Sequence, residues 1–347
     1  MKIVLFTSYL KRIAWLFLPL ILSLFVGSLL ILAVGRNPLS TYANLLESGF
    51  SCKAGQGRCA LATALQFATP LILSGLSATV ALRGGFFSIG QAGQMLFGAA
   101  AASWLGGYLS LPPVIHSMIA LTGAALLGGL WGLVPAFLKH FIGVNEIIST
   151  LLLNPIASVL VSLLWLPGVD VSARLSPLLP STKLTSGIFI ALIAALLIYL
   201  FLWNTKYGME MRANANAPRF ALYGGMPTLK PILLTTALSG ALAGLAGGVE
   251  VLGVHYQFVS NFSAVNDFDG LIVAFAGHLH PAGVVLLAFL LGGLRTGSIV
   301  GLQIQSGIPR ELGGVLIAFM LIFLAGNRFT HVHVQKASKN SAEIISS

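Results

Sequence analysis

The residues of this sequence that could do chemistry are amide and carboxylate side chains within long apolar segments. Gln91 and Gln94 are three residues apart, so on a helix they share one face. Asn154 precedes Pro155, which frees a backbone carbonyl within a helix, and Glu250 ends a further apolar run. Polar groups are costly in a membrane, and amides and carboxylates hydrogen-bond the hydroxyl and amine groups of solutes. We predict that they line a solute path, with a purely structural role as the open alternative.

Two aromatic residues, Phe86 and Phe87, directly precede this polar region. Their rings have the shape to stack on a sugar or a base, which adds them to the predicted path. The alternative is that they pack against lipid or neighbouring helices. Asn145 and Glu146 begin another apolar run, where we predict a structural role at the start of a helix.

Motifs for covalent or hydrolytic catalysis are absent from the sequence. It has no HExxH, CxxC or G-x-S-x-G motif, and no Gly-Lys dipeptide, which excludes a Walker A phosphate loop. The histidine pairs His278 with His280 and His331 with His333 are better explained by an interfacial turn and a tail than by metal binding. We therefore expect no catalytic residue, metal or cofactor in this chain. If ATP drives the protein, another chain binds it.

The composition predicts an all-α integral membrane protein. A mean hydropathy of +0.92 with only 8% charged residues excludes a soluble domain of 347 residues. A helical span needs about 20 mostly apolar residues. About ten segments qualify, of which the eighth and ninth are short: 13–34, 61–82, 88–107, 114–138, 146–166, 187–203, 231–252, 268–277, 281–294 and 308–326. The first is longer than the apolar region of a signal peptide and lacks an A-x-A-like cleavage site, so we expect an anchor.

Lysine and arginine placement predicts the orientation, because positively charged loops stay in the cytoplasm. With the N-terminus inside, twelve of the 19 basic residues fall on the inner side and seven on the outer side. Both termini, the polar segment 204–230 and the tail 327–347 are then cytoplasmic, and segment 36–60 lies outside. The net charge of +10 is thereby explained by topology, and no nucleic-acid partner is expected.

The two cysteines, Cys52 and Cys59, both fall in the predicted outer loop. The intervening residues include two glycines that ease a turn, and an oxidising exterior favours a disulfide. Two free thiols are the alternative.

Short runs recur about half a chain apart and predict an internal repeat. The pairs are Gly143–Ile147 with Gly307–Leu312, and Ala68–Gly75 with Thr235–Gly240. The charge argument places the two copies on opposite faces, so units 61–166 and 231–326 would share one fold with inverted topology. Inverted repeats with broken or short helices are typical of transporters. Chance similarity between apolar segments is the alternative.

Glycines recur every fourth residue at Gly240, Gly244 and Gly248, which gives one helix face a smooth stripe. Such stripes allow close helix packing in lipid. We expect packing within the chain, with a dimerisation face as the alternative.

Four runs of this sequence resemble the membrane subunits of bacterial ABC importers in the branched-chain amino acid/ribose permease superfamily. They are ATPLILSGLSATVALRGGFFSIGQAGQMLFGA, GVNEIISTLLLNPIA, MRANANAPRFALYGGM and FDGLIVAFAGHLHPAGVVLLAFLLGGLRTGS. The resemblance covers about residues 68–326 and is greatest to the simple-sugar and nucleoside branch. Where relatives have Phe-Asn-Ile-Gly-Ala-Glu-Gly-Gln, this chain has a serine at position 88 and lacks the acid. This departure leaves the exact solute open.

The resemblance implies one transmembrane permease domain, 1–347, in the bacterial cytoplasmic (inner) membrane. It implies two inverted repeats that rock in alternating access, and a dimer with an identical or different second permease chain. An ABC ATPase subunit would bind ATP and Mg, and a periplasmic or lipoprotein solute-binding protein would deliver a nucleoside or simple sugar. A branched-chain amino acid permease and an ion-coupled secondary transporter are the alternatives.

The resemblance also gives segment 204–230 a role, because in such permeases the loop between the repeats forms a short helix that docks on the ATPase. The residues that match this motif are Gly208, Arg212, Ala213, Asn216, Pro218, Arg219, Ala221, Gly224 and Gly225. We predict a helix capped by Asn216 that ends before Gly224. A basic loop that only enforces topology is the alternative.

Overall fold

The computed structural model describes residues 21–22, 24–52, 59–179, 182–227, 229–259, 263–308, 313–315 and 318. Most of these residues are helical, and none of them belongs to a β-strand. They form two compact units, Cys52–Gly293 and the combination of Met1–Ser51 with Leu294–Ser347. The unit boundary falls within α12 (Pro281–Gly297).

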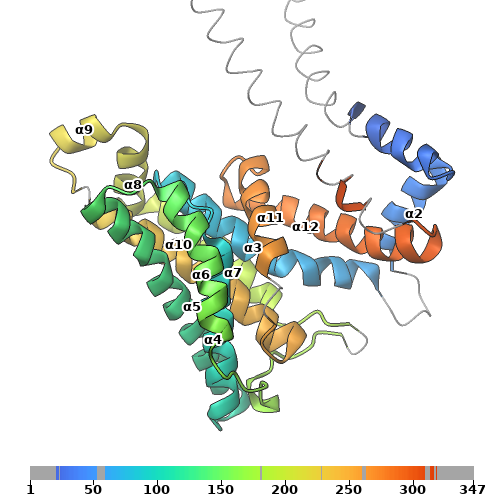
Figure 1. Cartoon of the computed structure of the whole chain (residues 1–347), viewed down its shortest axis with the longest axis horizontal. Helices are drawn as coiled ribbons and strands as arrows, with labels where there is room; N and C mark the ends of the chain where they lie inside the picture. Colours follow the sequence, from blue (N-terminus) through green and yellow to red (C-terminus); the bar gives the residue numbers. More distant parts are fainter. Residues whose placement is uncertain are drawn as a thin grey trace, which may run out of the picture. The chain divides into compact units, whose positions relative to one another are not determined.

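The larger unit holds nine complete helices among its described residues, coloured from blue to orange in Figure 1. They are α3 (Ala60–Arg83), α4 (Gln91–Tyr108), α5 (Pro113–Phe137), α6 (Glu146–Ser162), α7 (Gly187–Asn204), α8 (Lys206–Asn216), α9 (Pro218–Tyr223), α10 (Leu229–Glu250) and α11 (Ser263–Ala276). α3 is buried along most of its length and packs against α7, α10 and α11. α10 packs in turn against α3, α4 and α5, so α3 and α10 form the centre of the unit.

Five helices of the described residues are long and apolar enough to cross a bilayer. They are Ala60–Arg83, Pro113–Ile142, Gly187–Asn204, Leu229–His255 and Pro281–Gln305, and each starts within two residues of a predicted span. A sixth is present if Leu24–Ala33 and Pro38–Phe50, bent by 112°, count as one. The protein is therefore a multi-pass helical membrane protein. The predicted total of ten stays a prediction. The predicted spans 88–107, 146–166 and 268–277 correspond to α4, α6 and α11, which are not among these helices, and 308–326 and the start of 13–34 lie largely outside the described residues.

Close backbone contact between α5 and α10 depends on glycine. A Cβ atom on Gly244 would lie 3.0 Å from Gly128 Cα and would also meet the Ala124 carbonyl. A Cβ atom on Gly240 would lie 3.0 Å from Gly129 Cα. The glycine stripe of α10 thus packs within the chain, which confirms that prediction.

The smaller unit contains a helix that the sequence analysis placed in an outer loop. This helix, α2 (Pro38–Phe50), is capped by Asn37, whose Oδ1 accepts the Leu39 N–H at 3.0 Å. Leu45 of α2 packs with Leu302 of the π-helical segment η4 (Ser298–Gln305). The loop assignment is wrong there, because α2 is too short and too amphipathic to be recognised as a span, although one face is buried.

Candidate functional site: solute path and coupling lobe

The start of α4 is held in place by polar side chains of α6. Asn154 donates from Nδ2 to the Ile89 carbonyl at 2.8 Å, and its Oδ1 accepts the Gly93 N–H at 2.9 Å. Thr150 Oγ1 accepts the Ile89 N–H at 3.2 Å. Since both ends of the Asn154 amide bind backbone groups, this residue positions the first turn of α4.

Gln91 and Gln94 lie in that first turn and are almost completely buried, with 0% and 3% of their surface exposed. Gln91 Nε2 donates to the Ser88 carbonyl at 3.3 Å. The Oε1 atoms of both glutamines have no hydrogen-bond partner among the described residues. An unpaired buried acceptor costs about 1–3 kcal/mol. These two atoms are therefore the polar groups of the predicted path that are available to a hydrogen-bond donor.

Gln94 faces the interior of the unit. A Cβ atom on Gly132 of α5 would lie 3.4 Å from Gln94 Nε2 and 3.1 Å from Gly240 Cα of α10. Nearby in the same core, Ser77 of α3 and Ser239 of α10 share a hydrogen bond of 3.0 Å between their hydroxyl groups. The helices α3, α4, α5 and α10 thus bring polar groups together away from the lipid-facing surface.

The two phenylalanines that we predicted to contact the solute, Phe86 and Phe87, lie against other side chains of the protein. Phe86 is 1% exposed, and Lys139 Nζ lies 5.3 Å from the centre of its ring. Lys139 Nζ also lies 2.8 Å from Glu146 Oε1, so the ring belongs to a charged cluster. The ring centre of Phe87 lies 6.2 Å from that of Phe275. Of the two phenylalanines, only the half-buried Phe87 has a ring that a solute could contact.

Two other predicted residues lie at helix ends. Asn145 caps α6 by accepting the Ile147 N–H at 2.9 Å, which confirms its structural role. Glu250 is the last residue of α10 and is 8% exposed. Its Oε2 atom lies 3.4 Å from His255 Nε2.

Segment 204–230 contains two helices, α8 and α9. We call residues 205–226 the coupling lobe, after the role that the sequence resemblance predicts for them. Thr205 Oγ1 caps α8 by accepting the Gly208 N–H at 3.1 Å. A Cβ atom on Gly208 would lie 2.8 Å from Leu202 Cα, so glycine lets α8 cross closely over the end of α7. α9 lies beyond the ends of the long helices (Figure 1).

The short helix α9 ends before Gly224, as predicted, but its predicted cap is wrong. Asn216 is the last residue of α8, and its Nδ2 donates back to the Arg212 carbonyl at 2.8 Å. The residue before α9 is Ala217, whose N–H donates to the Ala213 carbonyl at 2.9 Å. Asn216 cannot cap α9 because its side chain already serves the helix that precedes it.

The far end of α9 is closed by glycine. Gly224 follows the helix, and Gly225 takes a φ of +71°, which favours glycine. The Met226 N–H then donates to the carbonyl of Ala221, a residue that is fully buried. The opposite side of α9 is open: Arg219 is exposed, and Tyr223 is 87% exposed.

A tryptophan at the end of α7 connects the lobe with the helices. The guanidinium of Arg212 lies 5.6 Å from the ring centre of Trp203, and that of Arg83 from α3 lies 5.4 Å from it. Arg83 also donates to the Leu279 carbonyl at 3.0 Å and to the His278 carbonyl at 3.3 Å. His278 and Leu279 have φ values of 59° and 53°, a strained region for these residues. Arg212 thus faces inward and braces the lobe.

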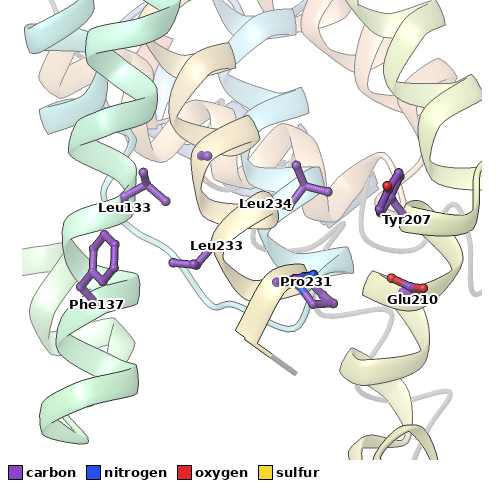
Figure 2. Close-up of a pocket in the computed structure, with 9 residues that line it drawn as sticks. Leu133, Phe137, Tyr207, Glu210, Pro231, Leu233 and Leu234 are labelled. Carbon is purple, nitrogen blue, oxygen red and sulfur yellow. The ribbon is translucent and has the colours of Figure 1, made fainter. Parts of the chain in front are cut away.

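A groove of 460 Å³ runs beside the lobe (Figure 2). α10 forms its floor with Leu233 and Leu234, α5 lines one side with Leu133 and Phe137, and α8 lines the other. The sequence analysis missed both this groove and the Trp203 cluster. The residues of each come from segments far apart in the chain. The only signal in the sequence is that charged and aromatic residues lie at the ends of the predicted spans.

The structure records a disulfide between Cys52 and Cys59. The described residues contain no group of three histidine, cysteine or acidic side chains that could hold a metal.

The long apolar helices define the chain as a multi-pass membrane protein. The chain belongs to the family described as branched-chain amino acid transport system / permease component, whose model matches residues 60–325. It is 36% identical to a guanosine ABC transporter permease of Bacillus subtilis, over 96% of this chain and 99% of the relative.

Two further relatives have related names. A nucleoside ABC transporter permease of Lactococcus lactis is 29% identical over 92% of this chain and 93% of its own length. A glucose ABC transporter permease of Haloferax volcanii is 28% identical over 90% of this chain and 87% of its own length. No solved structure matches the chain.

Proposed function

We propose that this chain is the membrane-spanning permease subunit of an ATP-driven importer for nucleosides. The observation that carries the proposal is the 36% identity, over nearly the full length of both chains, to a guanosine permease. A simple sugar is the second candidate, favoured by the glucose permease at 28% identity.

The solute path contains Gln91 and Gln94. Their unpaired Oε1 atoms are acceptors, and a nucleoside offers donors from its ribose hydroxyls and base N–H groups. We propose that alternating access exposes these atoms first to one side of the membrane and then to the other. Phe87 and Glu250 extend the path, while Phe86 and Asn154 support its walls. No bond of the solute is made or broken.

The coupling lobe supplies the contact with a separate ATPase subunit, which binds ATP and Mg. Support comes from the exposed face of α9 and from the Arg212–Trp203–Arg83 brace, which joins the lobe to α3 and α7. A force applied at α9 would reach the solute path through this brace. Arg212 transmits the motion, and Arg219 lies on the docking face.

The complete importer has further parts. It contains a second permease chain and an external solute-binding protein. The similarity to ABC transporter permeases supports both parts. The chain has ten spans in two inverted repeats, lies in the bacterial inner membrane and has both termini in the cytoplasm. The basic residues of segment 204–230 support that orientation.

Competition for uptake tests the solute class. Cells that express the complete importer are given labelled guanosine together with excess adenosine, glucose or leucine. We expect adenosine to compete and leucine to have no effect. Competition by glucose alone would assign the path to simple sugars, and competition by leucine alone would contradict the nucleoside assignment.

A further inference from the structure

The groove beside the coupling lobe has walls suited to hydrocarbon. Its floor on α10 includes Leu233, Leu234 and Ala237, and the α5 side adds Leu133 and Phe137. None of these five side chains can form a hydrogen bond, so this part of the groove cannot orient a polar solute. Its volume of 460 Å³ is that of a small-ligand site, which spans about 300–1,000 Å³.

The rim of the groove carries one uncompensated positive charge. Glu210 and Lys230 are its two charged lining residues. Lys206 Nζ lies 3.9 Å from Glu210 Oε1 and balances that carboxylate. Lys230 is exposed and forms no ion pair with any residue that the structure describes. The rim therefore attracts a negatively charged group to Lys230.

The position of the groove matches the boundary between headgroups and acyl chains. Phe137 lies near the end of the span Pro113–Ile142, and Lys230 is the second residue of the span Leu229–His255. Tyr207 on the α8 side is 61% exposed, as is typical of aromatic residues at a membrane surface. The labelled apolar side chains Leu133, Phe137, Leu233 and Leu234 face the groove from two spans (Figure 2), and Lys230 is exposed at the start of one of them.

We propose that this groove binds one anionic phospholipid, with its phosphate at Lys230 and an acyl chain along α10 between α5 and α8. The lipid joins the coupling lobe to the two spans. This role is independent of which solute is carried.

Lipid retention measured by native mass spectrometry tests the site. The full-length permease is purified from nanodiscs that contain equal amounts of phosphatidylglycerol and phosphatidylcholine. Lys230→Ala removes the charge, Ala237→Phe fills the groove, and Lys230→Arg restores the charge. Arg219→Ala is the matched control, because Arg219 is an exposed cation of the adjoining coupling lobe and does not line the groove.

We expect the wild type to retain one phosphatidylglycerol in preference to phosphatidylcholine. Lys230→Ala lowers this retention about fivefold, the contribution of one lysine to anionic-lipid binding. Ala237→Phe lowers it without changing charge, and Lys230→Arg and Arg219→Ala leave it unchanged. Equal retention of the two lipids, or an equal loss in Arg219→Ala, would overturn the proposal. A loss of partner-chain binding in Ala237→Phe, with lipid retained, would assign the groove to that chain instead.

Discussion

At the scale of residues, two amides of similar chemistry have opposite surroundings. Asn154 uses both ends of its amide to hold Ile89 and Gly93, whereas the Oε1 atom of Gln94 is buried without a partner among the described residues. A native structure rarely leaves such an acceptor unpaired without a reason. The sequence identified both residues as polar groups in apolar helices, but it could not separate a structural amide from one available to a solute.

Replacing each amide by an apolar residue of similar shape distinguishes the two roles. We expect Gln94→Met to raise the KM for guanosine about two- to tenfold, the range that corresponds to a lost hydrogen bond of about 0.5–1.5 kcal/mol. Asn154→Leu should instead lower stability, by about 1–3 kcal/mol for each backbone group left unpaired.

Thermal unfolding of both purified variants, together with uptake kinetics, makes the comparison. If Gln94→Met unfolds as easily as Asn154→Leu and transports normally per folded molecule, Gln94 is a structural residue.

At the scale of elements, the coupling lobe is joined to the long helices by contacts that the hydrophobic pattern of the sequence does not predict. α8 and α9 follow from local signals, namely the Thr205 cap and the glycines after Tyr223. The Trp203 cluster does not, because Arg83 and Arg212 reach the same ring from helices far apart in the sequence. Hydropathy reports how long a helix is and not which helix it meets.

The Trp203 brace predicts an uncoupled phenotype. Trp203→Ala removes the face on which Arg83 and Arg212 lie, each contact being worth about 0.5–2 kcal/mol. We expect the ATPase to stay bound while solute no longer stimulates ATP hydrolysis. Trp203→Phe, which keeps an aromatic face, should restore most of the stimulation. Normal stimulation of ATP hydrolysis in Trp203→Ala would show that the Trp203 cluster does not transmit the motion.

The seam between α5 and α10 predicts a packing defect. Gly244→Ala would drive a methyl group into the backbone of Ala124 and Gly128, and overpacking costs about 1–3 kcal/mol. Gly314→Ala is the matched control, because no atom of the described residues lies within 4 Å of a Cβ atom there. Thermal unfolding in detergent should show a lower melting temperature for the first variant alone. Equal melting temperatures would mean that α5 and α10 can move apart without loss of stability, which would contradict the prediction.

At the scale of the whole molecule, the sequence predicted the membrane class, the starts of the five described spans and the short helix α9. It missed α2, whose one buried face is too short to register as a span, and it misplaced the cap of α9. Composition and hydropathy are enough to predict which segments lie in lipid. They do not predict which residue caps a helix when neighbouring helices compete for it, or which helices pack together.

The proposed orientation predicts opposite accessibility for Cys52 and Cys59 on one side and for the coupling lobe on the other. In intact cells, after mild reduction, Cys52 and Cys59 should react with a membrane-impermeant maleimide. Arg219→Cys, placed in a chain with both native cysteines replaced by serine, should react only after the cells are permeabilised. Labelling of position 219 in intact cells would contradict the predicted orientation.

The central claim is that this permease moves a nucleoside when a separate ATPase acts on the coupling lobe. The most direct measurement is guanosine accumulation in proteoliposomes that hold the complete importer, with ATP or ADP, for the wild type and for a chain that lacks residues 213–224. We predict accumulation only for the wild type with ATP, and loss of ATPase co-purification in the deletion variant. Accumulation with ADP, or a deletion variant that still binds the ATPase and transports, would contradict the account.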